Sequence, residues 1–273
     1  MKRISYFLTA SLTMAALIFS SCEKMDNSPI ADELVSDDEV ASYFEDLLSE
    51  MDDITTESTG AKTDAEYKVL SSGSRTVETT FSEDTTIHTV TFTDFVNGNS
   101  QYQRVKNGVM IIKVLGRPID ETFWRQISFD NFSVDGNTVE GVKEVEKTGE
   151  YQFTITLTGG KVNFTDGTMH TREFEHIRTW TAGYDTPFFI WDDEFETEGS
   201  ASGVNRNEQN YSRTIINPLL VKRNCRWIVE GSIEIEVGER FATLDYGNGE
   251  CDRFATVTVD DESWTINLRG GSM

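Results

Sequence analysis

Hydrophobic and polar residues alternate along most of the chain that follows residue 67. In the segment 151–158, YQFTITLT, aromatic and aliphatic residues occupy every second position and polar residues the positions between. Segments 232–237 and 264–268 repeat this period of two. Because successive side chains of a strand point to opposite faces of its sheet, the pattern predicts antiparallel strands with one face in a core and the other in water.

Short glycine-containing segments interrupt these runs and predict the turns between strands. They lie at 97–98, 107–108, 135–137, 159–160, 166–167, 238–239 and 247–249. Their spacing predicts a dozen or more strands joined mainly by hairpins, and only four prolines are present to interrupt them. We therefore expect residues 67–273 to form a single all-β domain, an antiparallel hairpin or meander arrangement built as either an open sheet or a sandwich.

One segment before this domain has a helical period instead. Its apolar residues recur three or four positions apart and are Val40, Phe44, Leu47, Leu48, Met51 and Ile54. Ser36 and Glu39 have the spacing of a capping box, which marks the start of a helix. We predict one short amphipathic helix near 37–54, with its apolar stripe packed against the β-domain rather than against a partner protein.

The chain begins with a pattern typical of exported proteins. Lys2 and Arg3 precede an apolar stretch at 4–19, which is shorter than the roughly 20 residues of a membrane-spanning helix. The small residues at 20–21 and then Cys22 follow. This arrangement resembles a bacterial lipoprotein signal, in which the chain is cut before the cysteine and the cysteine is acylated.

From this resemblance we expect residues 1–21 to be a signal peptide and Cys22 to be the lipidation site. Phe19 departs from the motif, which prefers a small aliphatic residue, and an ordinary cleaved signal is the alternative. The lipoprotein interpretation places the protein in the outer membrane, anchored by its lipid, on the cell surface or on the periplasmic face. Residues 23–26, EKMD, partly resemble the charged export tags of surface lipoproteins of Bacteroidetes.

The charge of the chain limits its partners. From Cys22 onward it carries all 47 acidic residues and 22 of the 24 Lys and Arg, a net charge of −25. Nucleic acid is excluded as a partner, because phosphate binding needs clustered Lys and Arg. Much of the acid lies in 22–66, which we interpret as an acidic tether that contains the short helix.

Two cysteines remain in the β-domain, Cys225 and Cys251. In an exported protein such a pair is more often a disulfide than a redox site, so we predict that they are bonded. A two-residue turn at 238–239 would pair Cys225 with Asp252, one position away from Cys251. A β-bulge or the glycine-rich turn at 247–249 has to absorb this offset.

The sequence contains no pattern that predicts catalysis, a metal site or a cofactor. His170 and His176 are too far apart along a strand to share a metal ion, and His88 stands alone. The segment 199–203 has Ala201 where a nucleophile elbow needs serine. The many carboxylates leave a glycan-active hydrolase as an alternative, since such enzymes need only two suitably spaced acids.

The segment 183–195, GYDTPFFIWDDEF, carries an unusual group of large apolar side chains. These are Tyr184, Phe188, Phe189, Ile190 and Trp191. Exposed, they would form an aromatic binding loop for a sugar or a protein. Folded over the end of the core, they would be hidden, and we expect this second arrangement because loops with so much apolar surface usually bury it.

Several segments are similar to predicted lipoproteins of Bacteroidetes of uncharacterised function. They are FDNFSVDGNTVEG (129–141), RTWTAGYDTP (178–187), GSASGVNRN (199–207), PLLVKRNCRWIVEG (218–231) and ATLDYGNGECDRFATV (242–257). The resemblance covers most of 85–268 and implies a cell-envelope protein with a β-fold, but no chemistry. Relatives often have a cysteine near position 99, where this chain has Asn99.

These observations predict a membrane-anchored envelope lipoprotein that binds a partner or has a structural role. Its membrane contact is the lipid anchor, and a protein or a glycan is the expected partner. The alternative is a glycan-active hydrolase or a glycan-binding accessory protein of a surface sugar-uptake system.

Overall fold

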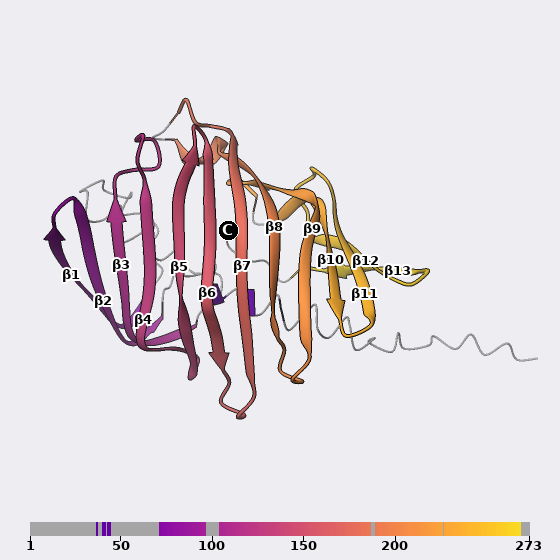
Figure 1. The fold of residues 1–273 in the computed structure, drawn as a ribbon, viewed down its shortest axis with the longest axis horizontal. Coiled ribbons are helices and arrows are strands. Elements are labelled where there is room, and N and C mark those ends of the chain that lie inside the picture. The colour runs from indigo at the N-terminus through magenta and orange to yellow at the C-terminus, as the bar shows by residue number, and fades with distance from the viewer. Residues whose placement is uncertain are drawn as a thin grey trace, which may run out of the picture.

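The computed structural model describes residues 37, 40, 41, 43, 44, 71–96, 104–186, 189–225 and 227–268. Thirteen strands of the described part form one open sheet, and each strand pairs only with its neighbours in sequence (Figure 1). All of these pairs are antiparallel. The prediction of an all-β antiparallel meander is confirmed, and of the two expected arrangements the chain adopts the open sheet.

The strands and a short 3-10 helix of the described residues follow each other in chain order. They are β1 (Ser72–Ser82), β2 (Thr85–Val96), β3 (Val105–Leu115), β4 (Trp124–Val134), β5 (Asn137–Gly149), β6 (Gln152–Asn163), β7 (Met169–Ala182), η2 (Ile190–Asp192), β8 (Glu194–Val204), β9 (Asn210–Lys222), β10 (Ile228–Val237), β11 (Arg240–Asn248), β12 (Phe254–Val259) and β13 (Glu262–Asn267).

One face of the sheet is buried across nearly its whole width. The strand register places a single row of residues side by side on this face: His88, Ile112, Ile127, Lys143, Leu157, Phe174, Ala201, Arg213, Ile235 and Ala242. All of them except Arg213 are buried. The row is mostly apolar and carries one histidine, His88, at its β2 end and two cations, Lys143 and Arg213, farther along. We call this side the inner face.

Residues that precede the sheet cover part of the inner face. Asp37, Val40, Ala41, Tyr43 and Phe44 are helical, and Figure 1 draws them as short indigo pieces at the level of β6 and β7. Three of them, Val40, Tyr43 and Phe44, belong to the apolar cluster of β2–β8. A second apolar cluster lies on β9–β13.

The packing predicted for the helical stripe is therefore found at Val40 and Phe44. Leu47, Leu48, Met51 and Ile54, and with them the extent of the predicted helix near 37–54, lie outside the described residues.

Two of the predicted turns are wrong. Gly108 and Gly160 lie inside β3 and β6, where the register of the strand pairs shifts. A tight turn and a β-bulge both favour glycine, so the residue type alone does not distinguish them. The turns at 135–137, 166–167 and 238–239 connect strands as predicted, whereas 97–98 lies outside the described residues.

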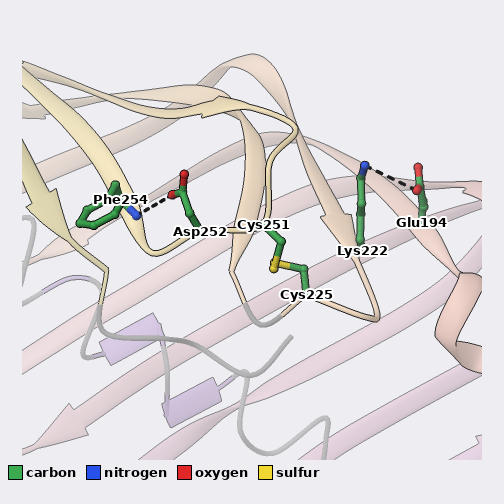
Figure 2. Close-up of a disulfide and its surroundings, with 6 residues drawn as sticks. All are labelled: Glu194, Lys222, Cys225, Cys251, Asp252 and Phe254. Atoms are coloured by element: carbon green, nitrogen blue, oxygen red, sulfur yellow. Dashed lines mark hydrogen bonds and ion pairs between the residues drawn. A yellow bond between two sulfur atoms is a disulfide. The ribbon is translucent and has the colours of Figure 1, made fainter.

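The predicted disulfide between Cys225 and Cys251 is present, with the two Cα atoms 5.7 Å apart. It joins the β9–β10 turn to the β11–β12 connection, next to the contact between Lys222 and Glu194 (Figure 2). The β10–β11 register does shift at Gly231, but it places Cys225 one position further from Cys251 and does not absorb the offset. Both cysteines lie beyond the paired residues, so the turns rather than the register bring the sulfur atoms together.

Candidate functional site

A cluster of polar side chains lies on the inner face, where most neighbours are apolar. His170 and Arg172 come from β7, Tyr211 and Arg213 from β9, and Tyr246 from β11. The members of each pair are two positions apart and therefore point to the same face of their strand. We call these five residues together with Asp37 the Asp37 cluster.

Strand β8 runs between β7 and β9, and its Gly203 makes room for the cluster. A Cβ atom at this position would lie 1.9 Å from the carbonyl oxygen of Thr171 and 3.0 Å from the Tyr211 ring. Any other residue would push these strands apart, so the glycine is required by close packing rather than by a turn.

Asp37 enters this cluster from the helical segment, and its side chain has no solvent exposure. Its carboxylate accepts a hydrogen bond from Nη1 of Arg172 and another, at 3.1 Å, from Nη1 of Arg213. Nη2 of Arg213 donates to the hydroxyl of Tyr246 at 3.1 Å. A buried carboxylate is thus held by two guanidinium groups from two different strands.

His170 is the neutral member of the cluster. Its Nε2 lies 2.9 Å from the hydroxyl oxygen of Tyr211 and 3.8 Å from Oδ1 of Asp37. The Tyr211 hydroxyl donates to the carbonyl oxygen of Thr171 at 3.2 Å, so we assign the imidazole proton to Nε2, which then donates to Tyr211. Nδ1 of His170 is buried and has no hydrogen-bond partner in the described part of the chain.

The pKa values in the cluster reflect burial and the two arginines. Burial opposes ionisation of Asp37, but Arg172 and Arg213 outweigh it and hold the pKa of this carboxyl well below its usual range. Burial lowers the pKa of His170 to about 4, although Asp37 acts in the opposite direction. Burial and the Asp37 charge both raise the pKa of Tyr211. The side chains of the cluster form most of their hydrogen bonds and ion pairs with one another. This arrangement is typical of a structural attachment rather than of a reactive centre.

Further contacts fix the helical segment beside Asp37. Nδ2 of Asn137 donates to the hydroxyl of Tyr43 at 2.8 Å, and the guanidinium of Arg104 lies 4.5 Å from the centre of the Tyr43 ring. Nζ of Lys143, on the inner face of β5, donates to the carbonyl oxygen of Phe44 at 3.4 Å. Part of the segment interpreted as a tether therefore packs within the folded domain.

The aromatic loop forms a second, different site. Tyr184 is 40 % exposed, Phe189 57 % and Trp191 59 %, so the expectation that this loop hides its side chains over the core is wrong for these three. The loop follows the end of β7 and leads into β8. Phe188 lies outside the described residues.

A fourth aromatic residue, Tyr151, joins this group. It is 38 % exposed in the β5–β6 turn and stacks on Tyr184, with the ring centres 4.2 Å apart and an angle of 26° between the planes. The alternating pattern of 151–158 assigned Tyr151 to the core side of a strand, but β6 begins only at Gln152. We call Tyr151, Tyr184, Phe189 and Trp191 the aromatic platform.

A buried carboxyl group lies beside the platform. Asp193 is only 6 % exposed, and its Oδ1 would lie 2.4 Å from a Cβ atom at Gly183, the residue before Tyr184. Burial raises the pKa of Asp193, with Arg223 acting against it. In the described part of the chain, neither this oxygen nor the indole nitrogen of Trp180 makes a hydrogen bond of normal geometry.

The remaining candidates have ordinary structural surroundings. Nδ1 of His88 is 2.9 Å from the hydroxyl of Thr79, and the His176 ring stacks on Phe174 with the ring centres 4.4 Å apart. No group of three or more His, Cys, Asp or Glu residues in the described ranges is placed to hold a metal ion. Within those ranges no helix has the length and apolarity to span a membrane. Cys22 lies outside them.

The comparisons with known proteins add no identity to this geometry. The chain matches no model of a protein family, none of the curated proteins and no solved structure.

Replacing Asp37 by Asn should strongly destabilise the protein. The change leaves two guanidinium groups on the inner face without their carboxylate, and breaking a buried ion pair in this way costs about 3–5 kcal/mol. Urea unfolding should show a correspondingly lower midpoint. Asp166→Asn is the matched control, because Asp166 pairs with Arg206 at an exposed turn and its loss should change the midpoint far less. A wild-type midpoint for Asp37→Asn would contradict the structural role of the cluster.

The stability of the protein should fall as the pH drops from 6.5 to about 4. In this window the unfolded chain protonates His170 at its ordinary pKa of 6.5, whereas the folded chain keeps it neutral down to about 4. The unfolded state then binds more protons, so acid favours it, by at most about 3 kcal/mol from this residue. Below the ordinary pKa of Asp37, 3.8, protonation of that carboxyl adds to the loss.

The measurement is the free energy of unfolding in urea between about pH 3 and pH 7, for the wild type and for His170→Gln. In the variant, the free energy of unfolding should depend much less on pH above pH 4. Below pH 4 it should still fall, because Asp37 is unchanged. Equal slopes in the two proteins would show that His170 is not the group responsible.

Proposed function

We propose that this chain is a lipid-anchored protein of the bacterial cell envelope, held in the outer membrane through Cys22, with a binding or structural role. The observation that carries the proposal is the N-terminal pattern: a basic start, a short apolar stretch and a cysteine at the expected cleavage point. The disulfide of the β-domain agrees with an exported protein, since such bonds persist in oxidising compartments.

The position of Asp37 supports a short connection between the lipid anchor and the folded domain. Asp37 follows Cys22 by 15 residues, a length that reaches at most about 50 Å when fully extended. Because Asp37 is fixed on the inner face by Arg172 and Arg213, the sheet would be held near the membrane surface. The acidic residues of this linker would keep it solvated and away from anionic lipid headgroups.

The geometry favours binding over hydrolysis. A glycoside hydrolase needs two carboxyl groups facing each other across the substrate, one of them with a raised pKa. The pKa of Asp193 is raised, but its side chain is buried. The neighbouring Asp192 accepts a hydrogen bond from the Thr186 hydroxyl at 2.7 Å. The exposed feature of this region is the aromatic platform, which is typical of a binding surface.

Replacing Cys22 by Ala should abolish lipidation. In cells fed labelled palmitate, the wild-type chain should carry the label and sediment with membranes. The variant should carry none and appear as an uncleaved or soluble product, because the acylated thiol is missing. Ser21→Ala, which keeps a small residue before the cysteine, should label normally. Undiminished labelling of Cys22→Ala would refute the site.

A further inference from the structure

We infer that the aromatic platform is a binding site for a neutral glycan, formed by Tyr151, Tyr184, Phe189 and Trp191. The inference rests on the proposed function in that it assigns a class of ligand to an envelope binding protein. The four rings come from two connections at the same end of the sheet, the β5–β6 turn and the segment between β7 and β8. Flat aromatic faces suit the C–H faces of sugar rings, which stack on them.

What distinguishes these rings is that they are exposed together, whereas Phe81, Phe241 and Phe254 are exposed on three different strands. Phe44, Phe92, Phe132 and Phe174 all lie in the core of the inner face. In the platform, by contrast, each ring keeps between 38 % and 59 % of its surface in contact with solvent. Several large exposed aromatic side chains gathered at one place mark an interaction surface, whereas scattered single ones do not.

The platform is held in a fixed shape before any ligand binds. The backbone N–H of Thr186 donates to the Gly183 carbonyl at 3.0 Å, and that of Phe189 donates to the Thr186 carbonyl at 2.8 Å. The Thr186 hydroxyl bonds Asp192, at the end of η2, at 2.7 Å. A loop that is already ordered loses little conformational entropy on binding.

The disulfide braces the same end of the sheet. Cys225 lies in the β9–β10 turn, and from this turn the N–H of Arg223 donates to the Asp193 carbonyl at 2.9 Å. The covalent bond to Cys251 therefore restrains a turn that also contacts the loop at Asp193.

The charges around the platform select against acidic ligands. Glu150 precedes Tyr151, Asp185 follows Tyr184, and Asp192 follows Trp191, and all three carboxylates are exposed. They repel polyanions and phosphate groups, but each can accept hydrogen bonds from the hydroxyl groups of an uncharged sugar.

Two polar atoms beside the loop are buried. Oδ1 of Asp193 is an acceptor and Nε1 of Trp180 is a donor, and the two side chains interact with each other without a hydrogen bond of normal geometry. A few polar groups beside an aromatic surface are the usual means of orienting a bound ligand.

The test is native affinity electrophoresis of the full chain in a polyoxyethylene detergent, whose headgroup contains no sugar. The gels contain laminarin, glycogen, yeast mannan or xyloglucan as neutral glycans, and polygalacturonate as the acidic comparison. We expect retardation by at least one neutral glycan and none by polygalacturonate. Trp191→Ala and Tyr184→Ala should each weaken this binding at least about tenfold, as the loss of an aromatic hot-spot residue does.

Two further variants separate binding from folding. Trp191→Phe keeps a ring and should bind within about threefold of the wild type. Phe241→Ala removes a similarly exposed ring on β11, 52 % exposed, near the opposite end of the sheet, and should not change binding. All four variants should keep the wild-type urea midpoint, because their side chains contribute little to the core.

Three results would overturn the inference: no retardation by any of the four neutral glycans, retardation by polygalacturonate alone, or unchanged binding in Trp191→Ala. If light scattering shows that Trp191→Ala converts a dimer into a monomer, the platform is an interface between copies and the glycan site is wrong. Palmitate labelling of the same preparation distinguishes these failures from a failure of the proposed lipid anchor.

Discussion

The ion pair between Asp37 and the two arginines of β7 and β9 attaches the helical segment to the inner face of the sheet. A sheet with one apolar face needs a cover, and the described part of the chain forms no second sheet to supply it. Val40, Tyr43 and Phe44 supply part of that cover. Apolar contacts are not directional, whereas a buried carboxylate can rest only where its guanidinium partners are. We therefore interpret Asp37 as the residue that sets where the helical segment lies.

The attachment at Asp37 also bears on how the proposed anchor and the aromatic platform are arranged. The N-terminal segment is attached on the inner face, and the aromatic platform projects from the β5–β6 turn and the β7–β8 connection, away from it. Hairpins connect almost all strands, so each strand is fixed by its neighbours, and glycine bulges such as the one at Gly231 let long strands bend. The disulfide then restrains the platform end. One end of the sheet thus carries the aromatic platform and the disulfide. The helical segment around Asp37 covers part of the inner face, and the chain before it contains Cys22.

The sequence predicted the fold class well, because a period of two reports directly which side chains share a face. It also predicted the disulfide and the packing of Val40 and Phe44. It did not predict the Asp37 cluster: Asp37 looked like a residue of a capping box, and its partner Arg172 lies 135 positions away. No local pattern identifies such a pair. The only signal was the unusual alternation of His170, Arg172 and Phe174 on one face, where polar and apolar residues share the core side of a strand.

The errors have a common physical cause. Glycine marks positive backbone angles but not whether a turn or a bulge uses them, which is why the pairs at 107–108 and 159–160, with positive φ at Gly108 and Gly159, were expected to be turns. Apolar side chains mark surface that is costly to expose, but not whether a ligand uses it, which is why the loop around Trp191 was expected to be hidden. In both cases the residue type limits which local structures are possible, and the surrounding strands determine which of them forms.

A double-mutant cycle between Asp37 and Arg172 tests this account most directly. The free energies of unfolding of the wild type, Asp37→Ala, Arg172→Ala and the double variant give the coupling between the two side chains. If the pair fixes the segment on the sheet, the double variant should be more stable than the sum of the single losses predicts, by about 2 kcal/mol or more. Asp37→Ala alone leaves Arg172 without its carboxylate, and Arg172→Ala alone leaves the buried carboxylate with only Arg213. Additive losses would mean that Asp37 and Arg172 do not depend on each other, and would contradict the central role of this ion pair.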